Sequence, residues 1–182
     1  MVISGTSPDR NIRARVSNYT QIEIEANPGV LDRYDEEQLG HQLARLAATT
    51  WVGYHRGRAE AYRRARGFTA SELAEAERPS DDPKQRRYEE ELNRITGEGL
   101  SAGRAVRIRT TGLMEWKFDI QRGSVRRLGG ERLLAEINSA AKAWLGDREM
   151  KIILLKAEYF DLGLPRKWRE LATRLQIGHR RH

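Results

Sequence analysis

The residues of this sequence whose types and spacing favour a chemical role are basic, and the chemistry they suit is the binding of anions. The 182-residue chain has 33 Lys and Arg residues against 26 Asp and Glu, a formal net charge of +7. Residues 1–100 carry 15 basic and 17 acidic side chains, whereas residues 101–182 carry 18 and 9. This asymmetry favours a polyanionic partner such as nucleic acid. Because Arg outnumbers Lys 27 to 6, an arginine-rich surface without a ligand is the alternative.

The basic residues of the second half form three groups. One alternates with apolar residues along a predicted hairpin, one surrounds the loop after it, where no acid occurs from Gln121 to Gly130, and one lies near the C-terminus. Arginine and lysine in such clusters contact phosphates without reading bases. We therefore predict that duplex DNA is bound by Arg107, Arg109, Lys117, Arg122, Arg126, Arg127, Arg166, Lys167, Arg180 and Arg181. A further arginine cluster, residues 56–66, is expected on a helix.

Catalytic chemistry has little support in the sequence. There is no cysteine, so disulfides, thiolate nucleophiles and zinc–thiolate sites are excluded. His41 and His55 are widely spaced, whereas His179 and His182 could bind a metal loosely but better fit a basic tail. No phosphate loop, nucleotide-binding glycine motif or nucleophile elbow is present. We expect no enzyme, no cofactor and no resident metal.

An internal repeat organises the chain. A shift of 94 residues aligns residues 12–52 with residues 106–146 without a gap, with identities such as Arg13/Arg107 and Gly29/Gly123. The apolar pattern also matches, first at the two-residue period of a strand and then at the 3.6-residue period of a helix. This predicts an α+β fold made of two copies of a β-hairpin followed by an α-helix.

Each predicted hairpin has a register. A turn at residues 17–19 places Ile12 opposite Ile24, Ala14 opposite Ile22 and Arg13 opposite Glu23. A turn at residues 111–113 places Val106 opposite Phe118, Ile108 opposite Trp116 and Arg107 opposite Lys117. The last pair joins like charges, which suggests a phosphate bridging them or an exposed pair of little cost.

The helices follow from apolar spacing and capping. Leu39, Leu43, Leu46, Ala47 and Thr50 predict one buried helix face, and Leu133, Ile137, Ala140, Ala141 and Trp144 predict the other. Residues 54–66 extend the first helix, residues 84–96 and 150–159 are expected to be helical, and Gly97, Gly99 and Gly103 to loosen the chain. The predicted organisation is a first unit at 1–66, a linker with a short helix at 67–83, a second unit at 84–164 and a C-terminal helix with a basic tail at 165–182.

In the second half, the string Ile95-Thr96-Gly97-Glu98-Gly99 follows a charged helix and precedes a hairpin with Gly112 at its turn, and an apolar-faced helix comes next. This pattern resembles the YbaB/EbfC family of nucleoid-associated proteins, and residues 13–47 resemble the same hairpin and helix without a preceding helix. The resemblance implies DNA binding with little sequence preference and a dimeric arrangement, either as a homodimer or as two units that form a pseudo-dimer within one chain. Members of the family also occur in proteins with other roles, including some linked to secretion.

The expected function is that of a nucleoid-associated or regulatory protein that contacts double-stranded DNA through its backbone, in the cytoplasm and at the nucleoid. A non-enzymatic adaptor or dimerisation platform is the main alternative, and an RNA-binding factor is a third. No run of apolar residues is long enough to span a membrane, so no membrane association is expected.

Overall fold

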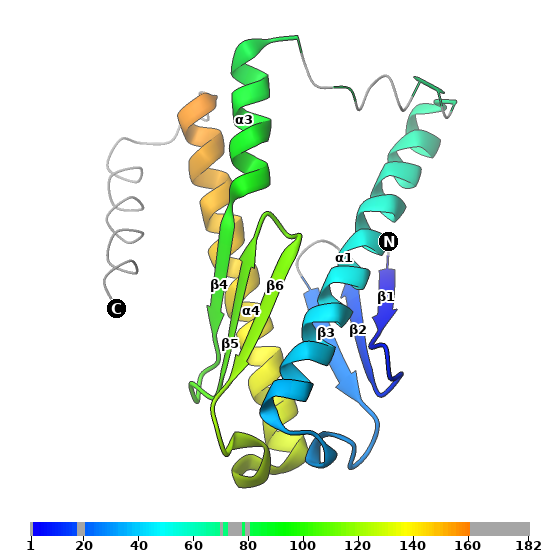
Figure 1. Cartoon of the computed structure of the whole chain (residues 1–182). Helices are drawn as coiled ribbons and strands as arrows, with labels where there is room; N and C mark the ends of the chain where they lie inside the picture. The colour runs from blue at the N-terminus through cyan, green and yellow to red at the C-terminus, as the bar shows by residue number, and fades with distance from the viewer. Residues whose placement is uncertain (1, 18–20, 70, 73–77, 79–80, 161–182) are drawn as a thin grey trace.

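The computed structural model describes residues 2–17, 21–69, 71–72, 78 and 81–160, and it is an α+β structure with two antiparallel three-stranded sheets (Figure 1). The first sheet has the order β1 (Val2–Thr6), β2 (Ile12–Ser17), β3 (Gln21–Ala26), and the second has the order β4 (Thr96–Leu100), β5 (Val106–Thr111), β6 (Glu115–Ile120). The helical elements are η1 (Leu31–Arg33), α1 (Glu36–Arg66), α3 (Pro83–Arg94) and α4 (Ser124–Tyr159).

The outer strands β1 and β4 are additions to the predicted hairpins. The prediction that the glycines of β4 loosen the chain was wrong, because they let the strand pass close to α4. A Cβ on Gly99 would lie 2.3 Å from the carbonyl oxygen of Ala140, and one on Gly97 would lie 2.4 Å from Nε1 of Trp144. Glycine is needed here for close approach of a helix.

Both predicted registers were wrong by two residues. In the first sheet Ile12 pairs with Ala26, Ala14 with Ile24 and Arg13 with Glu25. Strand β2 extends to Ser17, which the prediction assigned to the turn, and β3 begins at Gln21; residues 18–20 lie outside the described part. Moving a turn by one residue shifts the pairing by two, so each side chain keeps its face but every partner changes.

The same shift in the second sheet changes the charge pairing. Arg107 lies opposite Asp119 rather than Lys117, and the like-charge pair is Arg109 with Lys117. Here the turn is formed by residues 112–114, because Gly112 and Leu113 both adopt positive φ, 58° and 61°. The Trp116 ring Nε1–H donates to the Leu113 carbonyl at 2.8 Å, which helps to hold this turn.

The helices follow the predicted apolar faces. Asp35 caps α1 by accepting the Gln38 N–H at 2.7 Å, and the helix continues without a break through the predicted extension to Arg66. The apolar residues predicted for the face of α4 are all buried, and those of α1 are buried except Ala47, which is partly exposed. Residues 150–159 belong to α4, as predicted, but this helix begins at Ser124 and is interrupted at Gly129, with φ 70° and ψ 166°.

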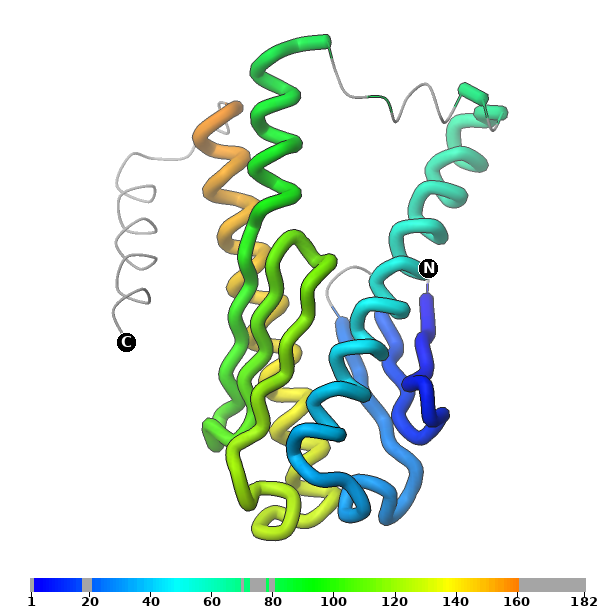
Figure 2. The backbone as a smooth tube through the Cα atoms, in the orientation of Figure 1, coloured from blue at the N-terminus to red at the C-terminus, as the bar shows by residue number. Residues whose placement is uncertain are grey.

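Each long helix contacts both sheets. Helix α1 packs on β1 and β2 and also on β6, while α4 packs on β4 and β5 and also on β3. Figure 2 shows α1 in front of the first sheet and α4 behind the second, each running along a strand of the other half. A Cβ on Gly40 would lie 2.6 Å from the Phe118 carbonyl oxygen of β6. The two predicted units therefore share one hydrophobic core.

Candidate nucleic-acid interface

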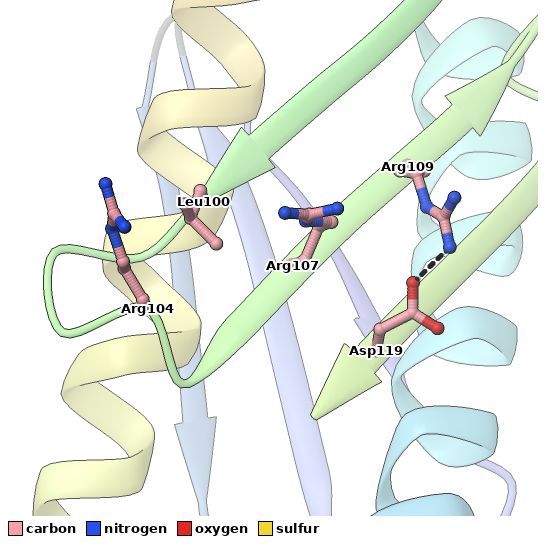
Figure 3. A pocket seen from close by; sticks show the side chains of 5 residues that line it. All are labelled: Leu100, Arg104, Arg107, Arg109 and Asp119. Atoms are coloured by element: carbon pink, nitrogen blue, oxygen red, sulfur yellow. Dashed lines mark hydrogen bonds and ion pairs between the residues drawn. The ribbon is translucent and has the colours of Figure 1, made fainter. Parts of the chain in front are cut away.

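The second sheet carries an open hollow on the face turned away from α4. Its volume is about 430 Å³, and we call it the arginine hollow; it is lined by Leu100, Arg104, Arg107, Arg109 and Asp119. Figure 3 shows Arg107 and Arg109 extending from β5 and Arg104 from the turn between β4 and β5. Alternate residues of a strand point to the same face, so β5 presents both arginines while Val106 and Ile108 are buried on the other face.

Arg104 reaches the hollow from a turn that α4 holds in place. The residue has φ 58°, in the left-handed region that arginine rarely adopts. The Glu136 carboxylate of α4 accepts the N–H of Gly103 at 3.0 and 3.1 Å and the Ser101 hydroxyl. The hydrogen bond from Ser101 lowers the pKa of Glu136; burial opposes it, and the Gly103 and Ala105 N–H groups and the charge of Arg127 lower the pKa further. Glu136 therefore remains ionised and fixes the turn.

The hollow is positively charged even after its ion pairs are counted. Arg107 Nε lies 3.4 Å from Glu98, and Arg109 donates to Asp119 at 2.6 Å. Lys117 also reaches Asp119, at 3.3 Å, so Asp119 serves two cations. The side chain of Arg104 makes no hydrogen bond or ion pair with any residue in the described part of the chain, and only its backbone N–H is bonded, to the Ser101 carbonyl at 2.9 Å. With Glu115, which alternates with Lys117 and Asp119 on the same face of β6, this face has four cations and three carboxylates and keeps one positive charge in excess.

Asp119 stays ionised between these cations. Partial burial acts to raise its pKa, but the hydrogen bonds from Arg109 and Lys117 and their positive charges outweigh burial, so the pKa falls below its ordinary value. The predicted like-charge pair of Arg107 with Lys117 does not form, and in the pair that does, Arg109 with Lys117, Asp119 bridges the two cations without a phosphate.

The equivalent face of the first sheet is neutral. Arg10 has φ 63° and stands 94 residues before Arg104, and Arg13 and Arg15 match Arg107 and Arg109. Their charges are balanced by Asp9, Glu23 and Glu25, with Arg15 and Glu23 3.8 Å apart. The excess charge is therefore a property of the second sheet.

Further predicted residues lie beside the arginine hollow. Gln121 N–H donates to the Ala105 carbonyl at 2.8 Å, so the turn that carries Arg122 lies against the turn that carries Arg104. Arg126 and Arg127 follow in the first turn of α4, where Arg127 donates to Gln121 and Ser124 at 3.3 Å. Arg122, Arg126 and Arg127 are all exposed. The structure thus places six of the ten predicted residues in one region, while Arg166, Lys167, Arg180 and Arg181 lie outside the described residues.

Sequence reasoning missed Arg104 and Glu136. Arg104 has a signal in hindsight, because it follows Gly103 in a turn and matches Arg10 under the 94-residue shift. Glu136 has none, because its role depends on a contact between α4 and a distant turn.

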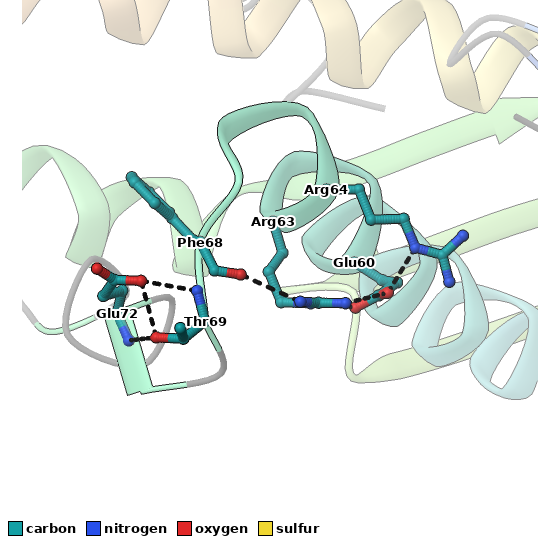
Figure 4. A network of polar contacts seen from close by, with 6 residues as sticks. All are labelled: Glu60, Arg63, Arg64, Phe68, Thr69 and Glu72. Atoms are coloured by element: carbon teal, nitrogen blue, oxygen red, sulfur yellow. Dashed lines mark hydrogen bonds and ion pairs between the residues drawn. The ribbon is translucent and has the colours of Figure 1, made fainter.

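The arginine cluster of α1 is partly used by the helix end itself. Figure 4 shows Glu60 bound to both Arg63 and Arg64, at 2.7 Å each. Hydrogen bonds from these two arginines lower the pKa of Glu60 to about 2. Arg63 also donates to the Phe68 carbonyl at 3.1 Å, just past the helix end.

After α1 the chain forms a capping box. Thr69 and Glu72 form a reciprocal capping box, in which Thr69 N–H donates to Glu72 at 2.7 Å and Glu72 N–H donates to Thr69 at 3.3 Å. The linker predicted at residues 67–83 falls partly outside the described residues.

The described residues contain no group of three or more His, Asp or Glu side chains arranged to bind a metal. Among them there is also no helix long and apolar enough to cross a membrane. Comparison of the chain with protein-family models, with curated proteins and with solved structures found no match.

Proposed function

We propose that the protein is a non-enzymatic DNA-binding protein that contacts duplex DNA mainly through the phosphate backbone. The observation that carries this proposal is the arginine hollow, where the guanidinium group of Arg104 has no partner among the described residues and positive charge is in excess. A role of this kind would place the protein at the nucleoid in the cytoplasm.

The hollow suits a phosphate chemically. A guanidinium group donates two parallel hydrogen bonds to phosphate oxygens. The ion pairs Arg107–Glu98 and Arg109–Asp119 join side chains that are 37–48% exposed, and exposed pairs contribute at most about 1 kcal/mol. A phosphate can therefore bind Arg107 and Arg109 while disturbing only weak ion pairs, and the guanidinium of Arg104 has no ion pair to give up.

Arg122, Arg126 and Arg127 extend the basic region along the same end of the second sheet. A backbone contact uses several cations on successive phosphates, and such contacts fix position without reading sequence. We accordingly expect little sequence preference.

We also infer that the chain is a tandem duplication whose halves form an intramolecular pseudo-dimer, in line with the resemblance to the YbaB/EbfC family. The bounds of β4, β5 and β6 follow those of β1, β2 and β3 by 94 residues. Gly29 and Gly123 share positive φ, as Arg10 and Arg104 do. The exchange of helix contacts between the halves further supports this inference.

The test is fluorescence anisotropy of a labelled duplex of about 30 base pairs, with the salt concentration varied. We expect log affinity to fall by roughly 0.9 per log unit of salt for each phosphate neutralised. Replacing Arg104 and Arg107 together by Ala should weaken binding to all duplexes and lower the slope by roughly 2. The matched control is Arg10 and Arg13 to Ala on the neutral face, which should leave the slope unchanged.

Binding that does not change with salt would overturn the proposal, as would equal losses in both double variants. Preference for structured RNA over the duplex would assign the hollow to RNA. Absence of nucleic-acid binding even at low salt, with a protein complex that survives nuclease treatment, would favour the adaptor alternative.

A further inference from the structure

The outer edge strands of the two sheets, β1 and β4, differ in whether their outward backbone groups are hydrogen-bonded. Helix α4 closes the edge of β4 with two side chains: Asp147 accepts the Glu98 N–H at 2.8 Å, and Lys151 donates to the Thr96 carbonyl at 3.0 Å. Asp147 and Lys151 also pair with each other at 2.7 Å. An incoming strand would need the same backbone groups, so this edge is protected against further pairing.

Strand β1 has an equivalent edge with no such cover. Ser7 N–H donates to the Ile12 carbonyl, and the antiparallel register Gly5↔Ala14 and Ile3↔Val16 continues that alternation. The backbone groups of Ile3 and Gly5 therefore face β2, and those of Val2, Ser4 and Thr6 face outward.

The helix beside β1 cannot close this edge. The positions of α1 that match Asp147 and Lys151 under the 94-residue shift are Gly53 and Gly57, which have no side chain to donate or accept. No backbone group of Val2, Ser4 or Thr6 has a hydrogen-bond partner on that side within the described residues. All three residues are exposed, Val2 by 60%, and Figure 1 shows β1 at the rim of the molecule.

We propose that β1 pairs with β1 of a second copy of this chain, antiparallel and about a two-fold axis through Ser4. In this register Ser4 exchanges hydrogen bonds with the partner's Ser4, and Val2 exchanges them with the partner's Thr6. The outward backbone groups of both strands are then satisfied by one symmetric, closed interface. This contact is separate from the pairing of the two halves within one chain, and it does not depend on the proposed function.

The chemistry of β1 favours a second copy as the occupant. The strand, Val-Ile-Ser-Gly-Thr, has none of the charges or prolines with which proteins block an exposed edge. A charged partner strand would gain no complementary charge from it, whereas an identical strand meets no repulsion. The arginines of the adjacent strand β2, Arg13 and Arg15, would be three strand spacings, or about 14 Å, from their counterparts. That distance exceeds the screening length of about 8 Å at physiological salt.

A cysteine cross-link tests the register directly, because the chain contains no cysteine. Hydrogen-bonded antiparallel pairs have Cα atoms about 5.5 Å apart, within the range that a disulfide spans. We expect Ser4→Cys to form a covalent dimer on mild oxidation, seen on a non-reducing gel. Thr6→Cys is the matched control: two Thr6 residues would be offset by four positions, about 13 Å, and should not cross-link.

Sedimentation velocity of the unmodified chain, over about 1–300 µM, gives the second measurement. We expect a monomer–dimer equilibrium. Ser4→Pro removes the outward N–H without removing a hydrogen bond to β2, and it should weaken the dimer by about tenfold or more. An unchanged melting temperature would show that the variant folds; if it does not fold, the cross-link decides.

A chain that stays monomeric at every concentration would overturn the proposal. So would a dimer that persists in Ser4→Pro and is not captured by Ser4→Cys, because the dimer contact would then lie elsewhere and the β1 edge would be left for a different partner strand.

Discussion

Glu136 lies in α4 and accepts the backbone N–H of Gly103 with both carboxylate oxygens, at 3.0 and 3.1 Å. This contact ties the turn that presents Arg104 to the helix on the opposite face of the sheet. The arginine hollow is therefore positioned by a residue that does not line it.

The first prediction concerns this carboxylate. Glu136→Gln keeps the size of the side chain but weakens the hydrogen bonds from Ser101 and Gly103, and we expect a loss of about 1–3 kcal/mol in the free energy of unfolding. Urea denaturation measures this loss. Glu131→Gln, at an exposed position of the same helix, is the control and should change stability little.

The difference in stability between wild type and Glu136→Gln should depend on pH, in a direction that the pKa of Glu136 sets. The pKa of Glu136 is lower in the folded chain than its ordinary value of 4.5, so its contribution is present above pH 4.5 and is lost as pH falls through the folded-state pKa. The stability difference between wild type and Glu136→Gln should therefore shrink as pH falls below 4.5. A difference that stays constant down to pH 2 would contradict the role given to the carboxylate.

A second prediction uses two glycines in different surroundings. Gly99→Ala places a Cβ 2.3 Å from the Ala140 carbonyl oxygen and 2.4 Å from the Trp144 nitrogen, both backbone atoms. Overpacking of this kind typically costs about 1–3 kcal/mol. Gly146→Ala, within α4 and with no atom inside 4 Å of the new Cβ, should instead stabilise the chain by up to about 1 kcal/mol.

Thermal or urea unfolding of the two variants provides the measurement. We expect the free energy of unfolding to fall in Gly99→Ala and to rise in Gly146→Ala. The substitution is the same in both, so the difference comes from the neighbouring atoms. Equal effects would mean that β4 can move away from α4 without cost.

A third prediction concerns Glu60. Its pKa is about 2 because Arg63 and Arg64 donate to its carboxylate. Since the folded pKa lies below the ordinary value, Glu60 favours the folded helix above pH 4.5, and this contribution is lost as pH falls from 4.5 toward 2.

Carbon-detected NMR titration of the carboxyl group measures that pKa. Removing both donors, in Arg63→Ala with Arg64→Ala, should return it toward 4.5. Arg56→Ala, on the same helix but absent from these contacts, should leave it near 2.

The sequence predicted the helices better than the sheets. Apolar spacing was sufficient to place α1, because helical structure is specified by neighbours within a few residues. The strand β4 was not predictable in this way: Gly97 and Gly99 are ordinary loop residues until Trp144 is known to lie against them. The register likewise depended on which residues form the turn, and period-two alternation does not distinguish shifts of two.

In the candidate site too, residues on a regular strand were predictable and residues positioned by distant contacts were not. Arg107 and Arg109 were accessible from alternation along one strand. Arg104 was not, because its position depends on a left-handed turn held by α4. The predicted cross-strand neighbour of Arg107 was also wrong, because in the observed register Arg107 lies opposite Asp119 and not Lys117.

The packing of each long helix against a strand of the other half has a consequence for how the chain is made. When residues 1–66 leave the ribosome, the surface of α1 that packs on β6 is still exposed, because β6 has not been synthesised. The surface of β3 that packs on α4 stays exposed for the same reason. Neither half is a self-sufficient folding unit. A protease cut between α1 and α3 should therefore leave two fragments that remain associated, because each fragment covers apolar surface of the other.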